Sequence, residues 1–267
     1  MKKINSISDF KKAKRNTKIK ILLLQLSLVV VILLGWELLT RFNIIDSFFL
    51  QSPSKIFTLL VEYIKSNEIF HHIYQTTLEA TLGLIISIGG GIFLATLLYL
   101  FPLLSKVLDP FLVLLNALPK SAIAPIIIIW LGTGVKGIIG VCVSFVLILT
   151  TINVLNHFNN VDQSLVIMMK TLGANKFQIL TKVIFPSNVI NIISTIKVGI
   201  GLSWVGVVVG EFLSSRSGLG YLIMYGGQVF KLDLVMMGIF ILSSIAFLMY
   251  GIVVIIEKIL SKKYLFE

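Results

Sequence analysis

The charged and proline residues that interrupt long apolar runs are the first candidates for chemistry in this sequence. Lys120 lies between Pro119 and Pro125 in one such run, and Glu211 ends another. If these runs cross a membrane, the lysine could attract an anionic solute, but it could equally pair with a carboxylate or reach the interface. Glu211 could be solvated, cap a helix, or take part in gating or packing. We expect Pro119 and Pro125 to break this run, because proline removes a backbone donor and kinks a helix. The carbonyls that it frees are tolerated in lipid where they face protein or water. We therefore interpret Pro119, Lys120, Pro125 and Glu211 as candidate residues of a solute pathway.

The composition predicts that the apolar runs do cross a membrane. Of the 267 residues, 57% are hydrophobic and 13% are charged, and the mean hydropathy of +0.99 is too high for a soluble domain. A helix needs about 20 apolar residues to cross a bilayer. Because lipid leaves the backbone only a helix or a closed barrel, we predict an all-α integral membrane protein with six transmembrane helices. The predicted spans are Ile21–Thr40, Ala80–Ser105, Phe111–Leu131, Gly137–Asn156, Asn188–Gly210 and Leu234–Ile256.

The distribution of basic residues predicts how the chain is oriented. The formal net charge is +11, and six spans place both termini on one side, which carries most of the Lys and Arg. Cytoplasmic segments are enriched in these residues, so we predict that both termini are cytoplasmic. The chain then divides into a basic cytoplasmic tail at 1–20, a six-span domain at 21–258 and a cytoplasmic tail at 259–267. Topology explains the basic excess, so no nucleic-acid partner is expected.

The residue patterns of enzymes and metal sites are missing. His71 and His72 are adjacent, but the third histidine, His157, is predicted on the opposite side of the membrane, so we interpret the pair as ordinary interfacial residues. The sequence contains no Gly-x-x-x-x-Gly-Lys-Ser/Thr phosphate loop and no His-Glu-x-x-His motif. Cys142 is the only cysteine, and its apolar neighbours indicate a packing role. We expect no catalytic residue, no metal and no cofactor bound by this chain.

Two local patterns add detail between and within the spans. Ser52 followed by Pro53 predicts the start of a short helix at the outer interface, whose apolar residues follow helical spacing: Ile56, Leu59, Leu60 and Tyr63. The second span carries small residues at successive i+4 steps, a ladder that lets another helix approach closely in lipid: Gly83, Ser87, Gly91 and Ala95. The sequence leaves open whether that second helix belongs to the same chain.

The longest polar interruption, at about residues 157–187, predicts two short amphipathic helices on the cytoplasmic side. We call it the hinged loop. Asp162 is a suitable N-cap for the first helix, and Gly173 stands where a glycine ends a helix. The apolar stripe of this helix follows i, i+3, i+4 and i+7: Leu165, Met168, Met169 and Leu172.

The second helix of the hinged loop is predicted from Asn175 onwards. Asn175 can cap it, and Pro186 is expected to stop it before the chain re-enters the membrane. Its apolar residues share one face: Phe177, Leu180 and Ile184. Two interpretations stay open on this pattern alone. The helices could lie flat on the lipid, or their apolar face could dock into a groove of a soluble partner.

The hinged loop resembles the signature loop of permease subunits of ATP-binding-cassette (ABC) importers. That signature reads Glu-Ala-Ala, three residues, Gly, nine residues and Ile-x-Leu-Pro. Aligned on Gly173, the Leu-Gly-Ala triplet at Leu172–Ala174 fits well, and the closing residues fall on Val183, Phe185 and Pro186. The chain departs from the signature at its start, where Ile167, Met168 and Met169 replace Glu-Ala-Ala. This departure affects the ion pair that the acidic residue normally makes and leaves the helical geometry unchanged.

Further segments resemble the nitrate/sulfonate/taurine-type family of these permeases. They are Ser52–Lys55, Leu118–Pro125, Trp130–Gly132, and Glu211 with Gly218–Gly220. The resemblance implies a transport subunit, not an enzyme, in the cell membrane of a bacterium. It implies three protein partners: a cytoplasmic ABC ATPase dimer bound at the hinged loop, a second permease subunit that we expect to be another copy of this chain, and an extracytoplasmic solute-binding protein.

The resemblance also implies a mechanism and a class of solute. The ATPases use ATP, and the permease carries the solute by alternating access. The solute is expected to be small and anionic or heterocyclic, of the sulfonate, nitrate or taurine kind; related permeases also carry thiamine-precursor pyrimidines and other small solutes. An ion-coupled carrier and an intramembrane enzyme are the alternatives. A carrier usually needs carboxylates in mid-membrane, and here the acidic residues fall near the ends of predicted spans: Glu37, Glu79, Asp109, Glu211 and Asp233.

Overall fold

The computed structural model describes residues 7–42, 44 and 50–264, and this part of the chain is helical between short turns. The helices before the hinged loop are α1 (Ile7–Arg41), α2 (Pro53–Lys65), α3 (Glu68–Leu100), α4 (Pro102–Ala117), α5 (Lys120–Leu131) and α6 (Val135–Asn159). The hinged loop holds α7 (Gln163–Thr171), α8 (Lys176–Ile179), the π-helix η1 (Leu180–Ile184) and α9 (Phe185–Ser187). The chain then forms α10 (Val189–Ser214), α11 (Leu219–Gln228) and α12 (Leu232–Tyr264).

Within the described residues, five helices are long and apolar enough to cross a membrane, and α4 with α5 makes a sixth if this bent pair is one span. The count agrees with the six predicted spans. The pair is bent by 99°. The break falls at Leu118 and Pro119, where Leu118 is extended, as a residue before proline tends to be. Pro125 lies inside α5 and does not break it, contrary to the prediction.

The helix boundaries differ most from the predicted spans in α1, α3, α4 and α12. α4 begins at Pro102, whereas the third span was predicted to begin at Phe111. α3 begins at Glu68 and ends at Leu100, whereas Ala80–Ser105 was predicted. The hydropathy pattern placed the start of α3 too late because the first turns of this helix carry polar side chains. α1 begins at Ile7 and α12 continues to Tyr264, so helix extends into both predicted tails. The outermost parts of those tails, residues 1–6 and 265–267, lie outside the described residues.

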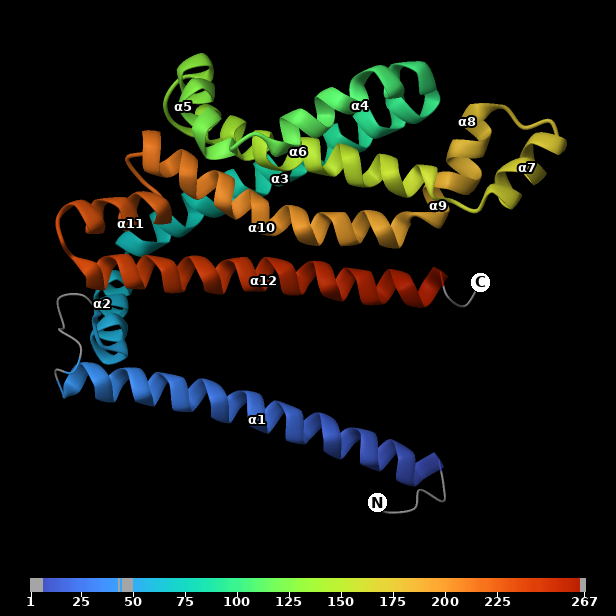
Figure 1. Cartoon of the computed structure of the whole chain (residues 1–267). Helices are drawn as coiled ribbons and strands as arrows, with labels where there is room; N and C mark the ends of the chain where they lie inside the picture. The colour runs from blue at the N-terminus through green and yellow to red at the C-terminus, as the bar shows by residue number, and fades with distance from the viewer. Residues whose placement is uncertain (1–6, 43, 45–49, 265–267) are drawn as a thin grey trace.

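The core lies where α3, α6 and α10 pack against one another, with α12 alongside (Figure 1). The small-residue ladder of α3 faces α6, and a Cβ on Gly91 would lie 2.6 Å from the Thr150 side chain. From the other side, a Cβ on Gly206 of α10 would lie 2.8 Å from the Cα of Cys142. Cys142 is fully buried between these helices, which confirms its predicted packing role. The ladder therefore brings helices of the same chain together.

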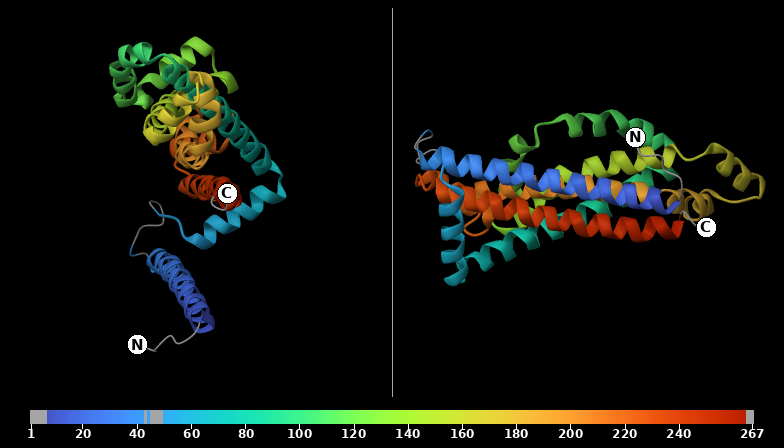
Figure 2. Two further views of the ribbon diagram at one scale, coloured as in Figure 1. Left: turned by 90° about the vertical axis from the view of Figure 1, so that its right-hand side faces the viewer. Right: turned by 90° about the horizontal axis from the view of Figure 1, so that it is seen from below.

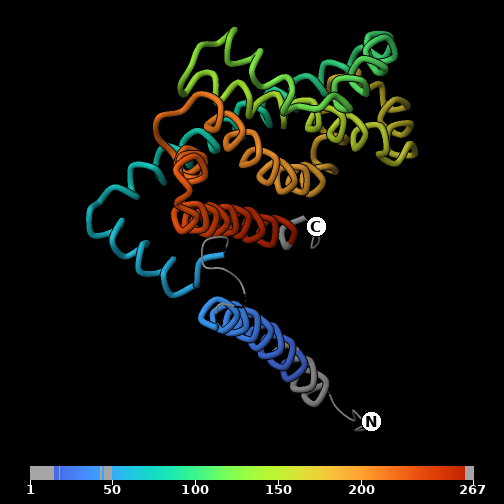
Figure 3. Tube along the Cα trace, turned by 60° about the vertical axis from the view of Figure 1, so that its left-hand side comes forward, coloured from blue at the N-terminus to red at the C-terminus, as the bar shows by residue number. Residues whose placement is uncertain are grey.

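α1 lies apart from this core and is joined to it through α2 (Figures 1 and 3). The start of α2 agrees with the prediction: Ser52 is the N-cap and Pro53 the first residue. Glu37 of α1 accepts hydrogen bonds from the N–H and the hydroxyl of Ser54, at 3.1 and 2.8 Å. α2 then buries Ile56 in a cluster with residues of α11 and α12.

The two ends of the helix bundle carry different structures. The hinged loop extends beyond α6 and α10 at the end where α1 begins and α12 finishes (Figures 1 and 2). α2 and α11 lie at the other end. We call these the loop end and the α2 end.

Candidate functional site

The first helix of the hinged loop, α7, begins where the sequence predicted. The Asp162 side chain accepts a hydrogen bond from the Ser164 N–H at 2.9 Å, and this bond lowers the pKa of the carboxyl below its usual value. The cap satisfies one of the N–H groups that the first turn of a helix leaves free.

Gly173 ends α7 in a Schellman turn. Its φ is +78°, a conformation that residues with a Cβ rarely adopt. The Gly173 N–H donates to the Lys170 carbonyl at 2.9 Å, and the Ala174 N–H donates to the Met169 carbonyl at 3.0 Å. Met169 and Ala174 pack against the same buried cluster. The chain therefore turns sharply while the last carbonyls of α7 stay hydrogen-bonded.

A reciprocal cap opens α8 directly after this turn. The Gln178 N–H donates to Asn175 Oδ1, and the Asn175 N–H donates to Gln178 Oε1, each at 2.8 Å. The cap by Asn175 was predicted, and the return bond to Gln178 completes a capping box. With both helix ends capped, the connection between α7 and α8 is a rigid turn.

The predicted apolar stripe of α7 is divided between two faces. Met169 turns inward with Val166, and both pack against the buried cluster at the loop end. The other three members stay exposed on the outer face, with Leu172 74% exposed: Leu165, Met168 and Leu172. We call these three residues the apolar knob. Phe177 on α8 is a further exposed apolar side chain, at 63%.

The three residues that replace Glu-Ala-Ala at the start of the signature loop still form a helix. Ile167, Met168 and Met169 all lie within α7. Ile167 is exposed, so the usual acidic position carries apolar surface here. The departure thus changes the chemistry of this position and leaves the backbone helical.

Pro186 does not end the second helix, contrary to the prediction. From α8 the chain continues as helix through η1 and α9 as far as Ser187, and α10 begins after a turn at Asn188. Proline has no N–H to offer the carbonyl of Lys182, and the wider π-helical turn directly before it accommodates this loss. The junction with α10 lies at Asn188, a buried residue whose Nδ2 donates to the Ile184 carbonyl at 2.8 Å.

The candidate pathway residues occupy two separate sites. Pro119 precedes α5, and Lys120 is its first residue, half-buried at the bend between α4 and α5. The Lys120 ammonium donates to the Asn116 carbonyl at 3.0 Å. Within the described residues, no carboxylate forms an ion pair with Lys120, and no hydrogen bond joins it to Glu211.

Glu211 lies at the α2 end and is 1% exposed, which excludes the solvated alternative. Thr76 Oγ1 of α3 donates to Glu211 Oε1 at 2.6 Å, and the Gly220 N–H donates to Oε2. Gly220 lies in the first turn of α11. Glu211 therefore caps a helix, as one of the sequence alternatives proposed, but the capped helix is α11 and the carboxyl packs in the core.

The turn before α11 presents three successive N–H groups to side chains of α3 and α10. The Gly218 N–H donates to His72 Nδ1 at 2.9 Å, and the Leu219 N–H donates to Thr76 Oγ1 at 2.7 Å. The third donor is the Gly220 N–H, which reaches Glu211. A histidine that accepts at Nδ1 is neutral, with its proton on Nε2. These bonds tie α3, α10 and α11 together, and we call the group the α2-end knot.

Both glycines of this turn are required by the Glu211 carboxyl. Gly218 has a φ of +109°, and a Cβ on it would overlap the carboxyl group. A Cβ on Gly220 would lie 2.6 Å from Glu211 Oε2. The Ser-Gly-Leu-Gly sequence that begins at Ser217 is therefore matched to Glu211, six residues before it.

Glu79 is a second buried carboxyl beside this knot. Gln75 Nε2 donates to its Oε1 at 2.6 Å, and within the described residues its Oε2 is buried without a hydrogen-bond partner. Glu79 lies well inside α3 and is fully buried, so the prediction that it falls near the end of a span is wrong.

The roles of His72 and Thr76 were missed at the level of sequence. His72 was interpreted as an ordinary interfacial residue, and Thr76 drew no attention. The available signal was spacing: residues 72, 76 and 79 follow i, i+4 and i+7, a polar face at the start of an otherwise apolar helix. Such a face in a membrane helix indicates a buried polar contact.

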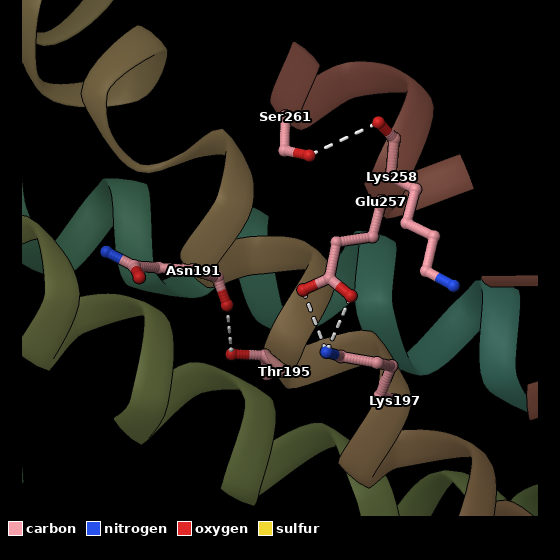
Figure 4. A network of polar contacts seen from close by, with 6 residues as sticks. All are labelled: Asn191, Thr195, Lys197, Glu257, Lys258 and Ser261. Carbon is pink, nitrogen blue, oxygen red and sulfur yellow. Dashed lines mark hydrogen bonds and ion pairs between the residues drawn. The ribbon is translucent and has the colours of Figure 1, made fainter. Parts of the chain in front are cut away.

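α10 also carries a charged contact towards the loop end. Lys197 Nζ lies between the two carboxylate oxygens of Glu257 on α12, at 2.8 and 2.9 Å (Figure 4). Figure 4 also shows Thr195, whose hydroxyl donates to the Asn191 carbonyl within α10. The ion pair joins α10, which continues from the hinged loop, to the last helix of the chain.

Comparisons with known proteins agree with this architecture. The family model described as "Binding-protein-dependent transport system inner membrane component" matches residues 87–262. The chain is similar to the putative aliphatic sulfonates transport permease protein SsuC of Bacillus subtilis, with 30% identity covering 89% of this chain and 86% of the relative. It is also similar to the formylaminopyrimidine transport permease protein ThiX of Halalkalibacterium halodurans, with 27% identity covering 84% and 89%.

A solved structure shares the fold. It is a chain of the MetNI methionine ABC transporter in an inward-facing conformation, with a TM-score of 0.57 and 16% identity. The match covers 71% of this chain and 93% of that chain.

Proposed function

We infer the function of this protein from the family to which it belongs, the binding-protein-dependent transport system inner membrane components. It is a permease subunit of an ABC importer, a transport component and not an enzyme, and a multi-pass protein of the plasma membrane. We propose that it forms the pathway for a small anionic or heterocyclic solute, and that its hinged loop is the contact with the ATPases.

The observation that carries the docking proposal is the apolar knob on a fully capped turn. Leu165, Met168 and Leu172 are exposed on one face of α7, which extends beyond α6 and α10 (Figure 1). An exposed apolar patch on a rigid element is typical of an interaction site. The knob enters an apolar groove of the ATPase, and the position of α7 past the ends of the spans favours this arrangement over one flat on the lipid.

The path from the knob into the membrane supports mechanical coupling. The chain is helical from α8 through η1 and α9, and only the turn at Asn188 separates α9 from α10, which packs against α3 and α6. Closure of the ATPases on ATP moves the docked helices, and α10 passes this movement to the core. The pathway then opens alternately to the two sides, because each state fits the ATPases differently.

The proposed orientation follows from the same contact. The loop end faces the cytoplasm, together with both ends of the chain, in keeping with the excess of basic residues there. The solute-binding protein delivers solute at the α2 end. None of the residues of α4 is buried, so this helix offers an apolar face for the second permease subunit, which we propose to be another copy of the chain.

The class of solute is proposed from Lys120 and from the relatives. The half-buried Lys120 ammonium has a backbone carbonyl as its hydrogen-bond partner and can also attract an anion. The name of SsuC refers to aliphatic sulfonates, and that of ThiX refers to a formylaminopyrimidine. A sulfonate fits the cation, so we propose an alkanesulfonate or taurine-like solute, with a pyrimidine as the alternative.

Co-purification tests the docking proposal directly. The permease with Leu172→Asp is co-expressed with the cognate ATPase, and the complex is captured through a tag on the permease. We expect the ATPase to be lost from the Leu172→Asp variant and retained by Lys182→Ser, a matched change of an exposed residue on η1. Normal recovery of the ATPase with Leu172→Asp would refute docking through the knob.

A further inference from the structure

A cavity of about 430 Å³ lies at the loop end, beside the apolar knob and distinct from it. Its walls come from the end of α3, the beginning of α4, the end of α6, and both α7 and α8. Because these spans finish at Leu100 and Asn159, the cavity lies at the level where helices leave the bilayer.

Three lysines from three different helices line this cavity: Lys106 of α4, Lys170 of α7 and Lys176 of α8. In the described part of the chain, none of the three forms an ion pair. The acidic residues near them in sequence are Asp109, one turn further along α4, and Asp162, whose side chain already caps α7. Three converging cations without a counter-ion repel one another, and a bound anion removes that repulsion.

The rest of the lining completes an amphipathic site. Ser105, Asn159 and Gln163 offer neutral hydrogen-bonding groups. The floor is apolar, and Leu98, Val166 and Ile179 on it belong to the buried cluster of the loop end. A cationic rim over an apolar floor suits a ligand that carries a phosphate next to a glycerol backbone and the first carbons of an acyl chain.

We propose that this lysine pocket binds the phosphate of an anionic phospholipid headgroup. The assignment rests on the proposed function in one respect, since docking of the loop places the pocket at the cytoplasmic leaflet, where anionic lipids attract basic pockets between helices. Two of the three lysines belong to the hinged loop and the third to α4. A bound headgroup therefore braces the loop against α4 and makes its position depend on lipid composition.

The test uses the purified full chain in detergent, without ATPase, and counts bound lipid by native mass spectrometry. Phosphatidylglycerol is titrated against phosphatidylcholine, and inorganic phosphate is added as a competitor. We expect preferential binding of phosphatidylglycerol, and a fall in its affinity of roughly tenfold or more in the triple variant Lys106→Gln, Lys170→Gln, Lys176→Gln. The matched control, Lys136→Gln, Lys182→Gln, Lys258→Gln, changes the same net charge outside the pocket and should keep the affinity.

Each other outcome overturns the assignment in a recognisable way. Equal binding of the two lipids by the unaltered chain would exclude headgroup recognition, whatever the variants do. Displacement of the lipid by inorganic phosphate at similar concentration would assign the pocket to a free phosphate. If the lysines affected only recovery of the ATPase, their partner would be an acidic surface of that subunit. Failure of the Leu172→Asp test would refute docking and leave these lipid measurements unaffected.

Discussion

Lys197 of α10 and Glu257 of α12 form an ion pair of 2.8 Å in which each side chain is only about a fifth exposed. α12 buries few of its residues in this chain, so the pair is a specific attachment of an otherwise loosely packed helix. Because α10 continues from the hinged loop, the pair also connects α12 to the element that we propose to move.

Removing one partner of this pair should destabilise the protein more than removing both. Glu257→Gln leaves the Lys197 ammonium without its counter-ion, at a cost of about 2 kcal/mol, whereas Lys197→Met with Glu257→Leu replaces both charges by apolar groups and should cost less. Thermal melting in detergent, followed by size-exclusion chromatography, measures the order of stability. A double variant less stable than Glu257→Gln would contradict this account.

The effect of a substitution at Gly173 should depend on whether the new residue tolerates the backbone conformation, and not on the volume of its side chain. No atom lies within 4 Å of a Cβ placed there, but its φ of +78° costs most residues about 1–2 kcal/mol. We expect Gly173→Val to uncouple ATP hydrolysis from uptake in proteoliposomes that contain the full importer. Gly173→Asn should retain coupling, because asparagine tolerates this conformation. Normal uptake by Gly173→Val would exclude the rigid turn as the transmitting element.

The α2-end knot predicts opposite outcomes for two glycines of α11. A methyl group on Gly220 would lie 2.6 Å from Glu211 Oε2, so Gly220→Ala should displace the carboxyl and destabilise the protein by about 1–3 kcal/mol. Gly227 has no atom within 4 Å of a Cβ, and Gly227→Ala should be neutral or slightly stabilising. Hydrogen exchange at residues 215–220 should rise in Gly220→Ala alone. Equal exchange in both variants would mean that the knot does not hold this turn.

Substitution of Lys120 should weaken the uptake of an anionic solute and leave the uptake of a neutral solute unchanged. If its ammonium makes a charge-assisted contact with a sulfonate, Lys120→Gln should raise the KM for alkanesulfonate uptake by roughly tenfold, and Lys120→Arg should retain most of the affinity. Uptake of a neutral aminopyrimidine, where it occurs, should not change. An unchanged KM for the sulfonate in Lys120→Gln would leave Lys120 with its backbone contact as a structural residue.

Local signals in the sequence predicted the hinged loop well and the α2-end knot poorly. Asp162, Gly173 and Asn175 act on neighbours within a few residues, so their identities alone place the caps. The knot joins Thr76 to Leu219 across 143 positions, and no local pattern specifies which distant N–H a threonine will meet. The boundary of α3 was missed for a related reason, because its polar first turns are satisfied by contacts that hydropathy does not include.

The prolines also separate what local sequence predicts from what the surrounding structure decides. Pro119 breaks the chain as expected, since the residue before it is extended. Pro125 lies inside α5 and Pro186 follows the wider π-helical turn, and neither ends its helix, because each removes only a single backbone hydrogen bond. Sequence alone identifies where a helix is weakened, and the surrounding packing decides whether it ends there.

The burial of Cys142 has a practical consequence for spectroscopy. It is the only thiol of the chain, and it is enclosed where α3 and α10 press against α6, out of reach of a maleimide in the folded protein. A cysteine introduced at Leu172, which is 74% exposed, would therefore be labelled selectively in an otherwise native sequence. A fluorophore placed there would report the position of α7 through each turn of the transport cycle, with no need to replace the native thiol.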